Sequence, residues 1–427
     1  MCSSGQFIRI SRLLPCVTVC VLMTGCGGVG DVASVFSELG LPEPPADAFK
    51  PWRVVGGDNS RIVFARLNGP AQALLRLSEP GFDAVAAGAS TSVVVTNPAG
   101  DAVVGPFDLP FAMGVAYADH RWLVLGDTAL RRVYAVDLDG GTTTNAWAER
   151  GAVSTQVLGL SAGRILIQAY VRGAMDGWVV QVVDVPTGQV TTLATDYAIS
   201  GAIDGDKVAL LFDNAVPAPV PLDDGTLVPA GGESLPSISV DSHLSRIVLF
   251  NLPNGTSDTI AQNADSLSAP ALGGGHLVWY ESAYTFDPRI DASQDRQVAL
   301  RSFDTHTAMT TTAMEWTESA DIGGMSDYMT IGAVGDGGFV VTHQTTSADS
   351  PANQHYRFEL RGWDGGTTLI QEYDQTARNL VYYDTNPVIV GRRLIYREPF
   401  SGNWMELDTS TGATIEISPP VLADASE

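Results

Sequence analysis

The chain has 427 residues, of which 48 are acidic and 24 are basic, so its formal net charge at pH 7 is -24. Apolar residues make up 45% of the composition, which excludes a disordered or collagen-like chain. A strongly acidic surface repels phosphate backbones and anionic lipid headgroups, and the only lysines are Lys50 and Lys207. We therefore expect no nucleic-acid partner and no polybasic docking on a membrane.

Residues 1–25 have the layout of a signal peptide. Arg9 and Arg12 precede an almost entirely apolar run over residues 13–25, and the whole segment contains no acidic residue. At about 1.5 Å of rise per residue this run is roughly 20 Å long, shorter than the ~30 Å hydrocarbon core of a bilayer. The pattern predicts a cleaved signal rather than a permanent transmembrane helix.

The end of this segment, Leu22-Met23-Thr24-Gly25-Cys26, resembles the lipobox of bacterial lipoproteins. The resemblance implies that Cys26 is acylated and becomes the first residue of the mature chain, which is thereby anchored to a membrane. All four cysteines lie at or before this site, so Cys26 would have no disulfide partner after cleavage. Because Gly27 rather than Asp follows the cysteine, the resemblance implies the outer membrane if the source is a diderm bacterium. The alternative is an ordinary secretory signal with an incidental cysteine.

Four segments are predicted along the chain. Residues 26–51 form a tether that is glycine-rich at its start and proline-rich at its end. One short amphipathic helix is expected within it, which either rests on the main domain or binds a partner. The other segments are the signal peptide (1–25), the main domain (52–418) and an acidic C-terminal tail (419–427).

The main domain reads as a succession of β-strands. Runs of β-branched and aromatic residues alternate with clusters of Gly, Asp, Asn and Pro, and no long helical periodicity occurs. Strands that are apolar on both sides must be covered on both faces, like the middle strands of stacked propeller blades. Such runs begin at Arg61, Ser92, Arg121, Arg164, Lys207, His276, Gly338 and Arg392.

Tight turns recur at one point of the repeated unit, each opening or nearly opening with Asp or Asn and closing with Gly. A four-stranded blade needs roughly 40 residues, so the runs at Arg61 and Ser92 are too close together to belong to two blades. The sequence predicts one all-β propeller of four-stranded antiparallel blades, with seven favoured over eight. A pair of β-sandwiches is the alternative. The turns occupy residues 137–141, 184–188, 251–255, 363–366 and 408–412.

This pattern resembles the TolB-like and WD-type propeller repeats of bacterial envelope proteins across residues 52–418. The resemblance is architectural, because the Trp-Asp and Gly-His pairs of WD-type repeats are absent as a set. Quinone-cofactor propellers carry a Trp soon after each Thr-Gly, whereas Thr187-Gly188 leads into Gln189. We therefore predict no cofactor, and the resemblance implies the activity of no single family.

Motifs for catalysis are weak. Gly159-Leu-Ser161-Ala-Gly163 matches the nucleophile elbow, but a strand rather than a helix is predicted after Gly163, which argues against a catalytic serine. The six histidines show no metal-binding spacing, so no metal site is predicted. His343 and His355 bracket a predicted long loop, where they could share a site.

Loop lengths place the candidate site. In a four-stranded meander the second and fourth connections emerge at the same end of the blade, and residues 213–243, 282–296 and 344–355 are all predicted as second connections. These excursions should gather on one face, where binding residues usually lie. Tyr284 and Arg289 are the preferred anchors. The full set of candidate binding residues is Tyr284, Phe286, Asp287, Arg289, Asp291, His343 and His355.

The expected function is that of a monomeric, lipid-anchored, non-catalytic module that presents this looped face to a protein or polysaccharide of the cell envelope. A hydrolase or lyase acting on glycan or peptide is the alternative, with paired carboxylates and a histidine at the mouth of the central channel. A structural assembly factor of the outer membrane is a third possibility. Because propellers host binding proteins and enzymes alike, the fold does not choose between them.

Overall fold

The computed structural model describes an all-β ring. The predicted signal peptide, tether and C-terminal tail lie outside the residues that it describes, as does Ser418 at the edge of the main domain. The described residues are 52–69, 88–109, 115–127, 132–148, 151–172, 177–213, 220–221, 227–228, 245–262, 266–284, 296–318, 326–347, 350–376 and 386–417.

The first three antiparallel units of the ring, blades 1 to 3, each consist of four strands that are consecutive in sequence. Blade 1 contains β1 (Arg53–Gly57), β2 (Ile62–Asn68), β3 (Ser90–Thr96) and β4 (Ala102–Leu109). Blade 2 contains β5 (Val115–Ala118), β6 (Trp122–Asp127), β7 (Arg132–Asp137) and β8 (Thr143–Trp147). Blade 3 contains β9 (Ala152–Ser161), β10 (Arg164–Val171), β11 (Gly177–Asp184) and β12 (Val190–Ala194).

Blades 4 and 5 carry additional short strands. Blade 4 contains β13 (Ala198–Asp204), β14 (Lys207–Asp213), β17 (Ser245–Asn251) and β18 (Thr256–Gln262), and a separate hairpin of β15 (Val220–Pro221) and β16 (Leu227–Val228) lies between β14 and β17 in the sequence. In blade 5, β19 (Ser266–Leu267) and β20 (Ala271–Gly273) both pair with β21 (His276–Tyr284), which is followed by β22 (Arg296–Asp304) and β23 (Met309–Glu318). Pro270 stands between the two short strands, where its missing N–H interrupts the ladder.

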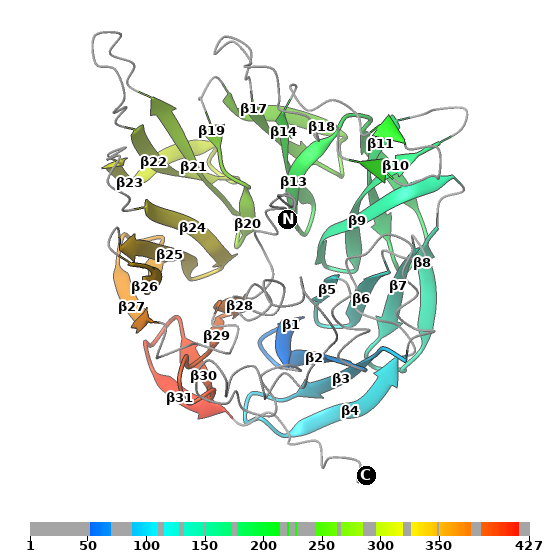
Figure 1. The fold of residues 1–427 in the computed structure, drawn as a ribbon. Helices are drawn as coiled ribbons and strands as arrows, with labels where there is room; N and C mark the ends of the chain where they lie inside the picture. The colour runs from blue at the N-terminus through cyan, green and yellow to red at the C-terminus, as the bar shows by residue number, and fades with distance from the viewer. Residues whose placement is uncertain are drawn as a thin grey trace, which may run out of the picture.

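Blades 6 and 7 complete the ring. Blade 6 contains β24 (Ser326–Gly335), β25 (Gly338–Ser347), β26 (Ser350–Gly362) and β27 (Thr367–Gln375). Blade 7 contains β28 (Val388–Val390), β29 (Arg393–Arg397), β30 (Trp404–Asp408) and β31 (Thr414–Ile417). The first strand of each blade lies toward the centre of the ring and the later strands lie toward its rim (Figure 1). The predicted propeller is confirmed. The described residues form seven blades, of which six have four strands and blade 5 has five, because β19 and β20 both pair with β21.

The repeated apolar runs of the sequence correspond to specific strands. Seven of the eight belong to the second strand of a blade, and the run at Ser92 belongs to β3, the third strand of blade 1. That strand is apolar on both sides because Val93 packs toward blade 2 and Val94 toward blade 7. The prediction that the first two runs share a blade is therefore correct.

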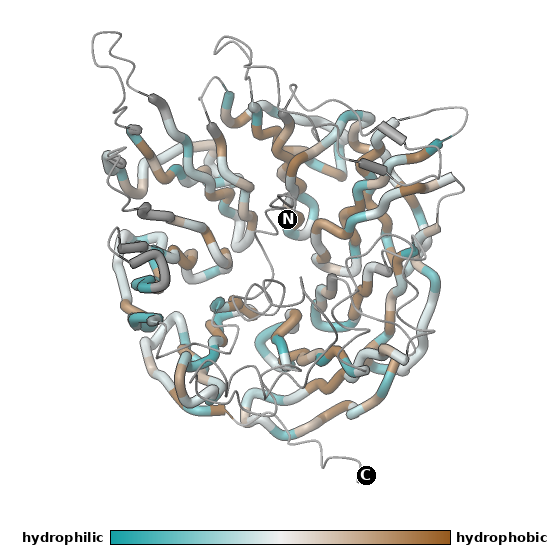
Figure 2. Tube along the Cα trace, viewed as in Figure 1, coloured by the Kyte–Doolittle hydropathy of each residue, from teal (hydrophilic) through white to brown (hydrophobic). Residues whose placement is uncertain are grey.

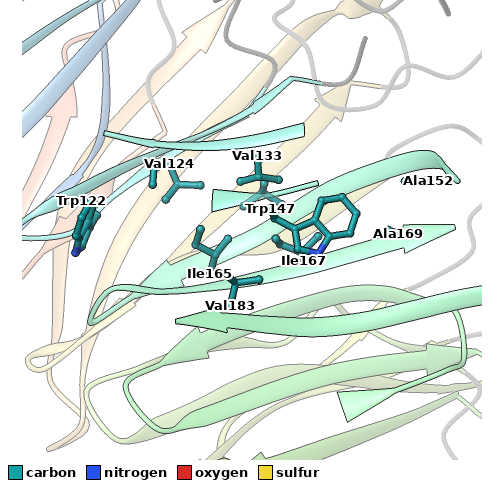
Figure 3. Packing of buried hydrophobic residues seen from close by; sticks show 11 residues of the cluster. Trp122, Val124, Val133, Trp147, Ala152, Ile165, Ile167, Ala169 and Val183 are labelled. Atoms are coloured by element: carbon teal, nitrogen blue, oxygen red, sulfur yellow. The ribbon is translucent and has the colours of Figure 1, made fainter. Parts of the chain in front are cut away.

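The core is divided among the blade interfaces. Each of the seven interfaces between neighbouring blades holds its own cluster of buried apolar side chains. Between blades 2 and 3, Trp122 and Trp147 pack against Ile165 and Ile167 (Figure 3). Hydrophobic residues accordingly lie along the strands within the blades (Figure 2). The outermost strands, such as β8 and β12, are largely exposed. Burial on both faces is why the second strands read as continuous apolar runs.

Blades 1 and 2 approach each other closely at the centre of the ring. Gly56 of β1 pairs in parallel with Ala118 of β5, which joins the two blades into one eight-stranded sheet. A Cβ atom at Gly56 would lie 1.9 Å from the carbonyl oxygen of Ala118, so only glycine fits this position.

The ring closes between blades 7 and 1 without a strand shared by the two sheets among the described residues. Phe64 of blade 1 and Trp404 of blade 7 meet edge to face, with their ring centroids 5.3 Å apart, inside the apolar cluster of this interface. The side chain of Arg393 donates a hydrogen bond to the carbonyl oxygen of Asp58 at 2.7 Å. Side-chain packing and polar contacts therefore hold the first blade to the last.

Candidate functional site

The two faces of the disc are built differently. The first and third connections of each blade emerge on one side, which we call the turn face, and the second and fourth connections emerge on the other, which we call the loop face. All five predicted tight turns are third connections, so they lie on the turn face as expected from the sequence. In the turn at Asp184, for example, the carboxylate Oδ1 accepts hydrogen bonds from the backbone N–H and the hydroxyl of Thr187 at 3.0 and 2.6 Å.

Two of the three predicted excursions begin and end at the loop face. One lies between β14 and β17 and the other between β21 and β22, which are both second connections. A third long second connection, between β2 and β3, was not predicted. Its bounds could have been inferred from the 31-residue interval between the runs at Arg61 and Ser92, which is longer than two paired strands and a tight turn require.

Most of the preferred binding residues lie outside the described residues. Phe286, Asp287, Arg289 and Asp291 belong to residues 285–295, of whose structure nothing is described. Tyr284 is the last residue of β21, and its backbone pairs with that of Arg296 at the loop-face end of blade 5. That Tyr284 and these four residues bind a partner stays a prediction.

The predicted long loop over residues 344–355 is wrong. Strands β25 and β26 continue through most of this segment, and the Cα partners are Gln344 with Tyr356, Thr345 with His355, and Thr346 with Gln354. Its Thr, Ser, Asn and Asp residues are typical of loops, but cross-strand pairing overrides that local preference. His343 and His355 consequently lie on neighbouring strands, at positions two register steps apart, rather than at the two ends of a loop.

His355 belongs to an ion-pair network on blade 6. Its Nδ1 lies 2.8 Å from Oδ1 of Asp374 and its Nε2 lies 3.0 Å from Oε1 of Glu372. Both carboxylates come from β27, directly beside β26.

Arg357 connects this network to Glu359, because its Nη1 lies 3.6 Å from Oε1 of Glu372. The two carboxylate oxygens of Glu359 contact Arg357 Nη2 at 2.7 Å and Arg361 Nη2 at 2.9 Å. Burial alone would raise the pKa of Glu359, but the two guanidinium groups outweigh it and the pKa lies below its usual value. Glu359 is therefore ionised and fully paired, which makes this part of the network structural.

The centre of the ring offers few charged groups. Along the seven innermost strands, from β1 to β28, the charged residues within the described ranges are Arg53, Asp204 and Asp327. Asp204 already accepts a long hydrogen bond, 3.4 Å, from the backbone N–H of Gly275 in the next blade. Within the described part of the chain no group of three or more His, Cys, Asp or Glu residues is arranged to hold a metal ion, and no helix is long and apolar enough to cross a membrane.

Ser161 has a structural role. It is the last residue of β9, and β10 begins at Arg164, so Gly159-Leu-Ser161-Ala-Gly163 forms a hairpin and not a nucleophile elbow. Its hydroxyl oxygen accepts a hydrogen bond of 2.9 Å from the backbone N–H of Gly205 in blade 4. The strand that the sequence predicts after Gly163 is therefore present as β10.

Sequence reasoning missed a concave site on the turn face. Trp363 stacks on the imidazole of His276 from blade 5, with ring centroids 3.9 Å apart and an angle of 16° between the planes. Next to it, a cavity of about 380 Å³ is lined by the third connection of blade 6, the first connection of the same blade and Thr409 of blade 7. A signal was present in the sequence, because the turn at 363–366 is the only one of the five that opens with an aromatic residue.

The comparisons with known proteins do not assign the chain to a family. No protein-family model matches the chain, and no curated protein does. Structural neighbours include TolB and other β-propeller proteins. The propeller domain of the Trilobed protease from Pyrococcus furiosus is 10% identical over 87% of this chain and 98% of that chain, with a TM-score of 0.49. TolB from Acinetobacter baumannii is 10% identical over 84% of this chain and 79% of that chain, with a TM-score of 0.36.

An enzyme is also among the neighbours. Oligogalacturonate lyase from Vibrio parahaemolyticus is 8% identical over 69% of this chain and 73% of that chain, with a TM-score of 0.36. Identities and TM-scores at this level transfer no activity, substrate or partner to the present chain. The assignment of the fold rests on the ring of blades itself.

Proposed function

We propose that the chain is a lipid-anchored module of the cell envelope that binds a protein or polysaccharide through its loop face. The observation that supports this most directly is the asymmetry of the disc. Short hydrogen-bonded turns close one face, whereas the second connections of blades 1, 4 and 5 add long segments to the other. Segments presented on one side of a rigid scaffold are where binding residues concentrate in folds of many kinds.

The anchor is tested by labelling. Cells that express the full chain are grown with radiolabelled palmitate, and the purified protein is examined for label. Cys26→Ala should lose the label and accumulate the uncleaved precursor, whereas Cys20→Ala, an equally small change within the same apolar run, should retain it. Equal labelling of both variants would contradict acylation at Cys26.

The loop face is tested separately. The detergent-solubilised chain is used to capture envelope components, and the double replacement Tyr284→Ala with Arg289→Ala should lower recovery of the main component at least about tenfold, as expected when two interface anchors are truncated. The control is Asp139→Ala on the opposite, turn face, which should leave recovery unchanged. Undiminished recovery by the double variant would remove the loop face of blade 5 from the binding surface.

A further inference from the structure

The cavity on the turn face, which we call the blade 6–7 hollow, is bordered by two carboxylates. Asp336 belongs to the first connection of blade 6 and Asp364 to its third, and both side chains are exposed. Neither has an ion-pair partner within the described part of the chain. Several other carboxylates on this face have an arginine partner: Asp137, for example, lies 2.8 Å from Arg121.

Blade 6 also lacks a basic side chain at a position where most of the blades have one. At the residue that pairs with the end of the first strand, five of the seven described blades carry an Arg, Lys or His, blade 2 carries Trp122 directly after Arg121, and blade 6 carries Gly338. Gly338 has φ of +147°, and a Cβ atom there would lie 2.1 Å from the carbonyl oxygen of Arg361, so no side chain can be built at this position. The five basic residues at this position are Arg61, Arg164, Lys207, His276 and Arg393.

The walls of the hollow offer acceptors, because several of their donors are already used. The indole Nε1 of Trp363 donates to the carbonyl oxygen of Gly335 at 3.1 Å. The hydroxyl of Thr409 donates to the carbonyl oxygen of Arg392 at 2.8 Å, and the backbone N–H of Gly366 donates to Oδ1 of Asp364 at 2.9 Å. Both oxygens of Asp336, Oδ2 of Asp364 and the lone pairs of the Thr409 hydroxyl remain to accept from a ligand.

An acceptor-rich hollow with two uncompensated negative charges is complementary to a group that only donates hydrogen bonds and carries positive charge. Guanidinium has five N–H donors and no acceptor, pairs with carboxylates in the plane of its fork, and packs against aromatic rings. A sugar hydroxyl, in contrast, needs donors as well as acceptors. We propose that the blade 6–7 hollow binds the guanidinium group of an arginine side chain from a partner polypeptide.

This site is independent of the loop face, since it lies on the opposite side of the disc. The arginine from outside takes the place of the basic residue that blade 6 lacks. The hollow is also well supported. A Cβ atom at Gly337 would lie 2.6 Å from Oγ1 of Thr409, which shows how closely blades 6 and 7 approach at its floor. Trp363 is fixed by its stacking on His276 and by its hydrogen bond to Gly335.

The test is a titration followed by NMR. The probe is N-acetyl-arginine amide, and the signal is the indole N–H resonance of Trp363, assigned by its loss in Trp363→Phe. The matched control ligand is N-acetyl-citrulline amide, which has nearly the same shape without the charge. Saturable shifts are expected with the arginine probe and none with the citrulline probe.

Variants make the result specific. Asp336→Asn should weaken binding at least about tenfold, because one charge-assisted contact is lost. Asp258→Asn removes the same charge from the exposed strand β18, away from the hollow, and should bind like the parent chain. The proposal is overturned if the citrulline probe gives the same shifts, if Asp336→Asn binds as well as Asp258→Asn, or if the Trp363 resonance does not move. Because Asp336 is exposed, its replacement is not expected to unfold the chain, and circular dichroism of each variant verifies this.

Discussion

The side-chain Oδ1 of Asn59 accepts a hydrogen bond of 2.8 Å from the backbone N–H of Arg392, across 333 residues of sequence. The first residue stands in the first connection of blade 1 and the second in the first connection of blade 7. The bond therefore lies at the seam of the ring, where the two terminal blades meet without a common sheet.

Replacing Asn59 by alanine should loosen this seam. The expected loss in free energy of unfolding is about 1 to 2 kcal/mol, since the N–H of Arg392 is left without its acceptor. Amide hydrogen exchange should accelerate in β1 and β28 and stay unchanged in blades 3 to 5. Asn97→Ala serves as the control, because Asn97 Oδ1 accepts only from Asp101 within its own turn. Uniform acceleration in all blades would mean that Asn59 is not specific to the closure.

Replacing Asp119, which links blades 2 and 3, should lower the free energy of unfolding more than replacing Ser161, which links blades 3 and 4. Its Oδ1 accepts from the backbone N–H groups of Arg121 and Trp122, and its Oδ2 accepts from Gly163 of blade 3 at 2.7 Å. Asp119→Ala leaves three N–H groups without acceptors and should lower the free energy of unfolding by about 3 kcal/mol or more. Urea denaturation measures the change.

Ser161→Ala is the matched comparison for Asp119→Ala. It removes one hydrogen bond between blades 3 and 4 and should cost about 1 kcal/mol. Equal losses for the two variants would contradict the idea that the number of satisfied N–H groups sets the cost.

Ala162 is held in an unfavourable backbone conformation. Its φ is +50°, in the left-handed region, within the two-residue turn that joins β9 to β10. Glycine adopts this conformation without the steric penalty of ~1 to 2 kcal/mol that a Cβ atom causes. Glycine also raises the entropy of the unfolded chain, which cancels part of this stabilisation. Ala162→Gly should therefore raise the free energy of unfolding by about 0.5 to 1 kcal/mol, measured by urea denaturation. A loss of stability would show that the turn tolerates alanine without strain.

Stability should depend on the protonation of His276. Burial lowers the pKa of its imidazole below the ordinary 6.5 and outweighs the opposing effect of the Asp304 carboxylate. The folded chain then binds this proton more weakly than the unfolded chain, so the free energy of unfolding decreases as the pH falls through about 6.5. His276→Phe keeps a ring against Trp363 but cannot titrate, and should show a shallower decrease between about pH 7.5 and 5. Parallel curves for the parent chain and the variant would contradict this assignment.

The fold was predictable because its repeat has a physical cause. Second strands such as β10 are buried on both faces and must be apolar throughout, and turns such as that at Asp184 need an Asp acceptor and a Gly with positive φ. The closure of the ring left no such trace. Asn59 and Arg392 are two polar loop residues in the sequence, and only the arrangement of all seven blades brings them together.

The candidate sites were less predictable. The polar residues before His355 have loop-like composition, and they form strands because β25 and β26 pair with each other along this segment, from Gln344 with Tyr356 to Ser347 with Ser350. The blade 6–7 hollow was missed for a different reason. Its sequence signal, Trp363 at the opening of a turn, does not by itself reveal a cavity, because the cavity also needs Thr409 from the next blade.

The direction of the terminal strands places both ends of the ring on the same face. Strand β1 runs from the loop face to the turn face and β31 runs back, so the chain before Trp52 and the chain after Ile417 both depart on the loop face. The anchor proposed at Cys26 would therefore join the ring on the side opposite to the blade 6–7 hollow. An arginine-bearing partner bound in the hollow would not compete with the anchor for the same face.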